Sequence, residues 1–136
     1  GTVQIVYGAR SKADLVAYKE IIDEWTNDSG IEVCLTIDNP QDDWDGHVGF
    51  IPNYVKELNP DTSKTVIMCG PPIMIKFTLA GLKELGFVDT QVFTTMEMRM
   101  KCGIGKCGRC NIGDKYVCKD GPVFSFDQLS ELPPEY

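Results

Sequence analysis

Positive charge and histidine are both scarce in this sequence. The 136 residues include 20 acidic and 13 basic side chains, which leaves a formal net charge of −7, and His47 is the only histidine. Nucleic acids and anionic membrane surfaces bind proteins through basic patches, so this charge balance argues against both as partners. A lone histidine has no identifiable partner for metal or acid–base chemistry, and we expect His47 to have a structural role in a loop.

Long apolar runs, repeats and low-complexity segments are also missing. No stretch approaches the roughly 18–20 apolar residues of a transmembrane helix, and no secretory signal precedes the first strand-like run. That run begins almost at the first residue, which is compatible with a missing upstream segment. Nothing in the chain suggests an oxidising compartment for its cysteines, so we expect a cytoplasmic protein.

Short β-branched runs alternate with amphipathic segments over most of the chain. Strands are predicted at residues 2–7, 31–37, 64–69 and 91–95, and helices at residues 11–28, 51–58 and 72–85, with a short helix near residues 126–132. Such alternation is typical of an α/β fold, here a doubly wound parallel sheet.

Apolar spacing predicts a buried face for each of the two longer helices. The helix at residues 11–28 is expected to bury Leu15, Tyr18, Ile22 and Trp25. The helix at residues 72–85 is expected to bury Ile73, Phe77, Ala80 and Leu85.

Ligands of doubly wound sheets bind beyond the carboxyl ends of the strands. The residues that follow the predicted strands are therefore candidates for a nucleotide crevice, and they are Gly8, Ala9, Arg10, Asp38, Cys69, Gly70, Pro71 and Pro72. The last four open a predicted helix, whose N-terminus favours a nearby anion. On its own, however, a strand–turn–helix junction with glycine and proline is often purely structural.

Four of the six cysteines lie within residues 101–119, in the spacing C-x4-C-x2-C-x7-C; they are Cys102, Cys107, Cys110 and Cys118. Thiolates ligate iron–sulfur clusters, and C-x4-C-x2-C with a distant fourth cysteine is the plant-type two-iron spacing. Gly103, Gly105 and Gly108 separate the first three cysteines. Because glycine readily takes positive φ, we expect these residues to turn backbone N–H groups towards the sulfurs.

Two other interpretations of the four cysteines are open. A structural zinc site usually pairs two short C-x2–4-C knuckles, and the step from Cys102 to Cys107 is at the long end of that range. A pair of disulfides would need an oxidising compartment. The spacing favours a two-iron, two-sulfide cluster over both.

Three motifs together resemble the ferredoxin–NADP reductase superfamily. They are YGAR at residues 7–10, CGPPIM at residues 69–74 and MKCGIGKCGRCNIGDKYVCKDGP at residues 100–122. The likeness covers residues 3–132 and is greatest to iron–sulfur flavoprotein electron-transfer subunits. These include the sulfhydrogenase gamma subunit and the electron-transfer subunits of anaerobic sulfite reductase and of dihydroorotate dehydrogenase B.

In that superfamily a β-barrel binds FAD, the following α/β domain binds NAD(P)H, and a C-terminal module carries one [2Fe–2S] cluster. The resemblance implies that Cys102, Cys107, Cys110 and Cys118 ligate the cluster. It places Cys69, Gly70, Pro71 and Pro72 beside the nicotinamide. It also places Gly8, Ala9 and Arg10 along the nucleotide, with Arg10 near the ribose or pyrophosphate. A carboxylate at Asp38 would disfavour a 2′-phosphate, which favours NADH over NADPH.

The sequence departs from the superfamily by lacking the FAD barrel and the glycine-rich first strand, turn and helix of the nucleotide domain. We therefore interpret residues 1–95 as a partial NAD(P)-binding domain and residues 96–136 as the [2Fe–2S] module with a C-terminal tail. The missing strand is central in the family's strand order, and an unpaired central edge favours association. We expect this chain to self-associate.

The resemblance implies a fragment of an NAD(P)H oxidoreductase electron-transfer subunit. Electrons would pass between nicotinamide, FAD on the missing domain and the cluster, and then to a catalytic partner of the hydrogenase, sulfite reductase or dihydroorotate dehydrogenase type. The cofactors carry that chemistry, so no catalytic side chain is assigned, and the isolated chain is expected to lack full activity. The alternative is a zinc-stabilised interaction module without redox activity. A stand-alone ferredoxin is disfavoured because the α/β portion makes up most of the chain.

Overall fold

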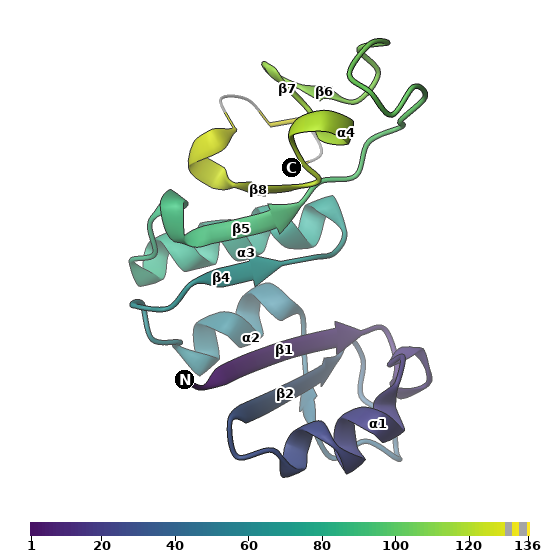
Figure 1. Cartoon of the computed structure of the whole chain (residues 1–136). Helices are drawn as coiled ribbons and strands as arrows, with labels where there is room; N and C mark the ends of the chain where they lie inside the picture. The colour runs from purple at the N-terminus through teal and green to yellow at the C-terminus, as the bar shows by residue number, and fades with distance from the viewer. Residues whose placement is uncertain (130–131, 134–135) are drawn as a thin grey trace. The chain divides into compact units, whose positions relative to one another are not determined.

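The computed structural model describes residues 1–129, 132–133 and 136. The chain divides into two compact units, Gly1–Leu58 and Asn59–Tyr136 (Figure 1). Each unit has its own three-stranded sheet. No helix in the described part of the chain has the length and apolar character needed to cross a bilayer.

The first unit is built on a parallel sheet in the order β1–β2–β3. β1 (Val3–Ala9) and β2 (Ile31–Ile37) pair residue for residue along their whole length. β3 (His47–Val48) adds two residues beside the end of β2. Among the described residues the other edge of β1 has no strand partner, so its backbone groups remain available for pairing.

The single helix predicted over residues 11–28 is wrong. The segment consists of a 3₁₀ turn η1 (Lys12–Asp14), the short helix α1 (Tyr18–Asp23) and a second 3₁₀ turn η2 (Trp25–Asn27). Ala17 interrupts it by taking the left-handed conformation, with φ of 58°.

The break at Ala17 also changes which face of this segment is buried. Leu15 is buried as predicted, and Tyr18 and Trp25 are half-buried, but Ile22 is 39% exposed and its neighbour Ile21 is buried instead. The interruption resets the phase of the helix, so spacing counted from Leu15 no longer identifies the buried positions.

Helix α2 (Ile51–Leu58) has the predicted bounds and packs closely against β1 at Gly8. A Cβ atom at Gly8 would lie 2.8 Å from Ile51 Cδ1 and 3.0 Å from Thr36 Cγ2. Nonbonded carbon atoms prefer separations of about 3.5–4.0 Å. Glycine is therefore needed at this position for α2 to approach the strand, whatever further role Gly8 has.

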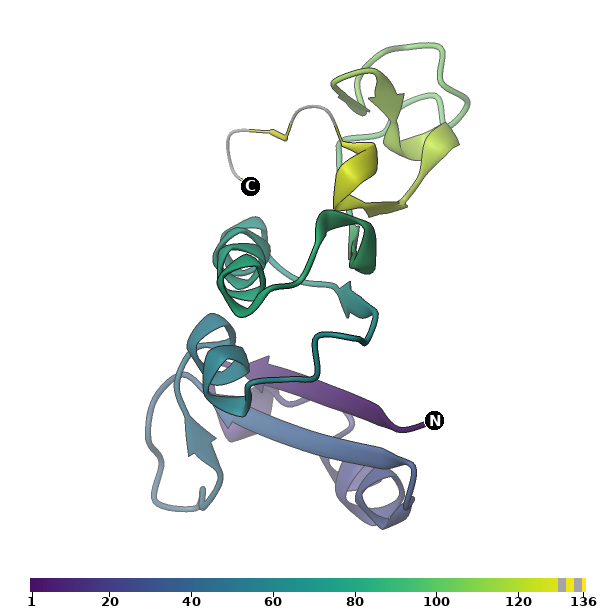
Figure 2. The same ribbon diagram turned by 90° about the vertical axis from the view of Figure 1, so that its left-hand side faces the viewer.

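The second unit contains a sheet in the order β4–β5–β8. β4 (Val66–Met68) and β5 (Val92–Thr95) are parallel, and β8 (Val123–Ser125) joins β5 in the antiparallel sense. Helix α3 (Pro72–Leu85) lies along one face of β4 and β5 (Figure 2). Ile67 on β4 is 75% exposed, because alternate residues of a strand point to opposite faces.

The bounds of α3 are as predicted, but its predicted buried face is wrong. Ile73 and Phe77 are 58% and 56% exposed, Ala80 is exposed, and Leu85 is half-buried. The buried positions are Ile75, Thr78, Leu79, Gly81 and Leu82. Apolar residues occur almost all round this helix, so spacing alone does not show which side meets the sheet.

The cysteine module follows β5 and consists of very short elements. A hairpin of β6 (Asn111–Ile112) and β7 (Lys115–Tyr116) leads into α4 (Val117–Asp120), then β8 and a 3₁₀ turn η4 (Phe126–Gln128). Its apolar core consists of Met96, Cys110, Ile112, Val117, Phe124 and Leu129. The helix predicted near residues 126–132 is only this turn at its start, and residues 130–131 lie outside the described residues.

The parallel α/β class predicted from the sequence is confirmed. The pairings β1–β2 and β4–β5 are parallel, and the predicted order of strands and helices is observed. The strands β1 and β4 belong to different sheets.

Candidate functional site

The loop between β5 and β6 folds around the sulfur atom of Cys102. Backbone N–H groups of Lys106 and Cys107 donate to Cys102 Sγ, with N–S distances of 3.3 and 3.4 Å. The N–H of Gly105 donates to Cys118 Sγ at 3.2 Å, which ties the loop to α4. Gly103, Gly105 and Gly108 each have φ of +71°. The predicted conformation of the three glycines, and amide donation to sulfur, are therefore confirmed.

These amide donors favour a thiolate at Cys102. Hydrogen bonds from the N–H groups of Ile104, Cys107 and Lys106 lower the pKa of the Cys102 thiol to about 6, since they stabilise the charged form. The pKa of the Cys118 thiol is raised, first by a hydrogen bond with Cys110 and second by burial, while the Gly105 N–H opposes the shift. Metal-bound cysteine is deprotonated, so the loop prepares Cys102 for that state.

The four clustered cysteines influence one another's ionisation. Cys107 affects the pKa of the Cys102 thiol, and Cys110 and Cys102 both affect the pKa of the Cys118 thiol. All six cysteines of the chain are free thiols. In the described part of the chain, no three or more His, Cys, Asp or Glu side chains are grouped to hold one metal ion. A two-iron cluster takes four cysteine thiolates, divided between its two irons. The donor set fits the cluster, and ligation by these cysteines stays a prediction.

In the first unit, the predicted nucleotide residues lie at the carboxyl ends of β1 and β2. Gly8 and Ala9 pair with Thr36 and Ile37, and the N–H of Asp38 donates to the carbonyl of Ala9 at 3.0 Å. Arg10 follows β1 directly and is exposed. Within the residues that the structure describes, its guanidinium makes no ion pair. The structure thus brings Ala9 and Asp38 together and leaves Arg10 accessible to an anion.

In the second unit, Cys69 to Pro72 form the predicted turn between β4 and α3. Cys69 is an exposed free thiol. Pro71 is the N-cap of α3, with φ of −60° and ψ of 145°, and Pro72 occupies its first turn. A fixed φ suits proline to this position, and the N–H groups of the first turn point out of the helix end. The two groups of nucleotide residues belong to different units, and their joining in one crevice stays a prediction.

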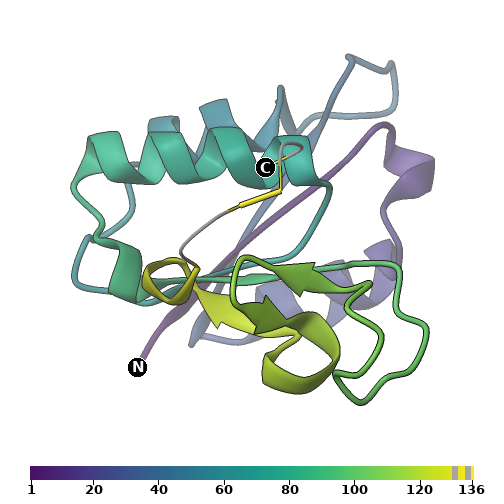
Figure 3. The same ribbon diagram turned by 90° about the horizontal axis from the view of Figure 1, so that it is seen from above.

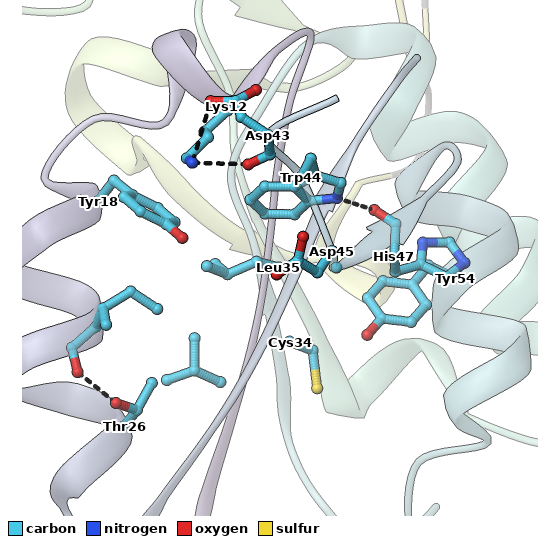
Figure 4. Close-up of a pocket in the computed structure, with 13 residues that line it drawn as sticks. Lys12, Tyr18, Thr26, Cys34, Leu35, Asp43, Trp44, Asp45, His47 and Tyr54 are labelled. Atoms are coloured by element: carbon cyan, nitrogen blue, oxygen red, sulfur yellow. Dashed lines mark hydrogen bonds and ion pairs between the residues drawn. The ribbon is translucent and has the colours of Figure 1, made fainter. Parts of the chain in front are cut away.

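The first unit also has an open pocket of about 370 Å³ that none of the predicted site residues line (Figure 4). It lies beside α1, β2 and the loop that precedes β3. Lys12 pairs with Asp43 there at 3.1 Å, and Trp44 Nε1 donates to the carbonyl of His47 at 2.9 Å. Burial raises the pKa of the Cys34 thiol at this pocket, and the Glu32 carboxylate raises it further. Cys34 is 7% exposed, as is typical of a free cysteine that packs as a small apolar residue.

Sequence reasoning missed the contacts of His47. Its Nδ1 lies 2.8 Å from Thr36 Oγ1, and its Nε2 lies 3.0 Å from Glu57 Oε2. The imidazole stacks on Tyr54, with ring centroids 3.7 Å apart. These partners come from β2 and α2, so no local spacing in the sequence reveals them. The contacts give His47 a structural role, as expected, but it lies in the strand β3 and not in a loop.

Two family models match this chain. Residues 1–80 match the oxidoreductase NAD-binding domain. The chain belongs to the oxidoreductase NAD-binding domain family. Residues 97–130 of this family member match the iron–sulfur cluster binding domain of dihydroorotate dehydrogenase B, and that segment contains all four clustered cysteines. The resemblance stated from the motifs is confirmed.

Proteins similar to this chain include a sulfhydrogenase subunit and electron-transfer subunits of dihydroorotate dehydrogenase B. The chain is 34% identical to sulfhydrogenase 1 subunit gamma of Pyrococcus furiosus, over 98% of this chain and 48% of that protein. It is 38% identical to the probable electron-transfer subunit of dihydroorotate dehydrogenase B (NAD(+)) from Thermococcus kodakarensis, over 94% of this chain and 48% of that protein. The chain thus spans about half the length of these relatives.

A solved structure of similar fold covers both units. The NADH-dependent reduced ferredoxin–NADP oxidoreductase, solved in a study of flavin-based electron bifurcation, matches with a TM-score of 0.66 and 27% identity. The match extends over 96% of this chain and 45% of that one. The fold predicted for this NAD-binding domain family member, a ferredoxin reductase type of α/β domain followed by a small cysteine module, is confirmed.

Proposed function

We propose that this chain is the C-terminal part of an electron-transfer subunit of an NAD(P)H oxidoreductase. Its [2Fe–2S] cluster passes electrons between an FAD held by a missing N-terminal domain and a catalytic partner subunit. Residues 1–95 form the partial nucleotide domain and residues 96–136 the cluster module. The observation that carries the proposal is the amide-lined cysteine loop, located within the segment that matches an iron–sulfur binding domain.

Cys102, Cys107, Cys110 and Cys118 hold the cluster, which supplies one-electron transfer when bound. Cys110 lies in the module's apolar core and is 1% exposed, whereas Cys107 is exposed. One side of the site is therefore anchored in the core while the other faces solvent. Backbone N–H groups of residues 105–107 donate to cysteine sulfurs, and such bonds raise the potential of a cluster by stabilising added negative charge.

The nucleotide is held by the residues at the strand ends. Cys69, Gly70, Pro71 and Pro72 lie beside the nicotinamide. The Met74 side chain occupies the space that a side chain at Gly70 would fill, so glycine is needed there for packing as well. Arg10 binds the ribose or pyrophosphate with its exposed side chain. Asp38 accepts from ribose hydroxyls and repels a 2′-phosphate, which favours NADH over NADPH. This chain needs no catalytic acid or base, because its residues bind and orient cofactors that carry the chemistry.

The partner is a catalytic redox subunit of the hydrogenase, sulfite reductase or dihydroorotate dehydrogenase type, and the compartment is the cytoplasm. The 136-residue chain by itself self-associates. In support of this, β1 and β4 each have one edge without a strand partner in the described residues, and Ile67, Ile73 and Phe77 are more than half exposed. Light scattering checks the association, and a monodisperse monomer would contradict it.

The proposed function is tested by anaerobic reduction of the purified, cluster-loaded chain with dithionite. We expect the visible absorption to bleach after uptake of about one electron per chain, because a two-iron cluster cycles between two states one electron apart. Titration with dithionite under an absorption spectrometer measures this uptake. A chain that binds iron and sulfide but accepts no electron would contradict the proposal.

A further inference from the structure

The loop that carries the first two cluster cysteines has an unusual composition. Residues 99–109 contain four cations, two large apolar residues, three glycines and two cysteines, and no acidic residue. The chain as a whole has a formal net charge of −7. Its positive charge is therefore concentrated around the cysteines. The four cations are Arg99, Lys101, Lys106 and Arg109.

All of these cations are exposed and none is neutralised by a neighbour. Within the part of the chain that the structure describes, no ion pair involves any of the four. The acidic residues on either side of the loop do not neutralise it: Glu97, two residues before Arg99, is exposed and makes no ion pair among the described residues, and two others have partners elsewhere. Asp114 pairs with Lys115 at 3.1 Å, and Asp120 accepts the N–H of Tyr116 at 2.7 Å. The positive charge of the loop is thus available to an outside partner.

A fifth cation joins the loop from α4. The space beside Gly105 is occupied by the side chain of Lys119, whose Cδ would be 3.1 Å from a Cβ atom at that position. Lys119 is exposed and follows Cys118, whose sulfur accepts the Gly105 N–H. Two chain segments therefore contribute positive charge to the same site.

Two apolar side chains are exposed among these cations. Met100 and Ile104 are 56% and 63% exposed. The module has an apolar core of its own close by, built on Met96 and Cys110, and neither side chain joins it. In the sequence, Met100 lies between Arg99 and Lys101, and Ile104 lies between Lys101 and Lys106. Apolar residues with charged neighbours are typical of an interface centre with a polar rim. We name the group Arg99, Met100, Lys101, Ile104, Lys106, Arg109 and Lys119 the cysteine-loop surface.

We propose that the cysteine-loop surface docks an acidic protein surface of the redox partner, with Met100 and Ile104 at the centre of the contact. This inference rests on the proposed function, because it assigns the partner that exchanges electrons with the cluster. The cations attract the partner and orient it, and the apolar pair holds it once water is excluded. Docking at this loop brings the partner to the exposed side of the cysteine site.

Neutralising the cluster does not by itself explain the surface. A cluster with four thiolates carries about two negative charges in its oxidised form, fewer than the five cations around it. Backbone N–H groups already donate to Cys102 and Cys118. Neutralisation also gives no reason for exposing Met100 and Ile104, whereas docking accounts for both the charges and the apolar pair.

The test uses the cluster-loaded chain, reduced with dithionite, as electron donor to two haem proteins of opposite charge, cytochrome b5 (acidic) and cytochrome c (basic). Stopped-flow absorption gives the second-order rate constants. We expect the rate with cytochrome b5 to fall about tenfold or more as salt rises from low to physiological levels, because steering by exposed charges is screened. The Lys101→Glu/Lys106→Glu variant should lower the low-salt rate with cytochrome b5 by a similar factor.

The matched control is Lys19→Glu/Lys76→Glu, which changes the net charge equally at exposed positions outside the surface. It should change the rate less than about twofold, since screening weakens distant charges. The variant Met100→Ser should raise the cytochrome b5 concentration needed for half-maximal rate. It should not alter oxidation of the reduced chain by ferricyanide, a small ion that needs no apolar contact.

Several outcomes would overturn the inference. If the two charge-reversal variants lowered the rate with cytochrome b5 equally, the cysteine-loop surface would have no special role. The same would follow if the chain reacted faster with cytochrome c than with cytochrome b5 and that rate fell as salt was added. Self-association that is lost in Lys101→Glu/Lys106→Glu would assign the surface to a second copy instead. A chain that takes up no iron and sulfide would refute the proposed function, and this inference with it. A loaded chain without the charge dependence would refute the inference alone.

Discussion

Replacing Cys102 by serine is expected to lower the iron and sulfide content of the purified chain, and its visible absorption, by roughly tenfold or more. Even the loss of groups that only orient metal ligands costs 10–100-fold in affinity, and here a ligand itself is removed. Cys102 Sγ is also the acceptor of N–H groups from the loop, which favour its thiolate. A serine hydroxyl has a far higher pKa and is a poor substitute.

Cys69→Ser is the matched control for this substitution. It replaces another free, accessible cysteine of the same unit that lies outside the loop, so iron, sulfide and absorption should stay at the level of the unchanged chain. Far-ultraviolet circular dichroism shows whether both variants keep their secondary structure. Loss of the cluster in both variants, or in neither, would contradict the assignment of Cys102 as a ligand.

Mixing the cluster-loaded chain with NADH in the absence of flavin is expected to leave the cluster oxidised. Nicotinamide donates a hydride, which carries two electrons, while the cluster accepts one, so a flavin is needed between them. The 136 residues span about half the length of the relatives, and we propose that the other half holds the FAD. We expect reduction by NADH to be slower than reduction by dithionite by a factor on the order of 10³ or more, which corresponds to at least about 4 kcal/mol in barrier height.

Anaerobic stopped-flow absorption with NADH, and separately with dithionite, measures both rates on one preparation. The dithionite arm is the control, because it shows that the cluster is competent to accept electrons. Bleaching by NADH alone at a rate near that of dithionite would contradict the proposal that a flavin held outside this chain is needed between NADH and the cluster. It would also mean that the nucleotide site is complete without a flavin.

The parts of the fold that the sequence predicts well are those with strong local signals. Helix α3 begins at Pro72 and ends before Gly86, whose φ is 103°, and proline and glycine at these two positions are reliable boundary residues. The strand β2 is an apolar and β-branched run with Glu32 as its one charged residue. In such segments, local preference and tertiary packing agree.

Other features depend on contacts that a linear pattern does not contain. Nothing in the local sequence requires Ala17 to take a left-handed conformation, so the break before α1 could not be foreseen. The buried side of α3 is chosen by the sheet, and both sides of that helix are apolar. The elements β6, β7 and β8 contain only two or three residues each. Such short strands are too short to show an alternation of apolar and polar residues in the sequence.

The sequence predicts the local structure of the cysteine site better than that of the nucleotide site. Cysteine spacing and the intervening glycines predict a loop with positive φ that turns amides to sulfur, and the structure has that loop (Figure 3). Gly8, predicted beside the nucleotide, proves to have a packing reason for being glycine, since Ile51 fills the space above it. A glycine in a motif therefore indicates that some other group lies close to the backbone at that position. Only the fold shows whether that group is a ligand or a side chain of the protein.

The central claim is that the four cysteines hold a two-iron cluster that carries electrons out of the nucleotide domain. Analysis of iron, acid-labile sulfide and zinc in the chain, purified without oxygen, tests it most directly. A two-iron site predicts about two irons and two sulfides per chain, with little zinc. About one zinc per chain without sulfide would contradict the claim and identify a structural zinc module.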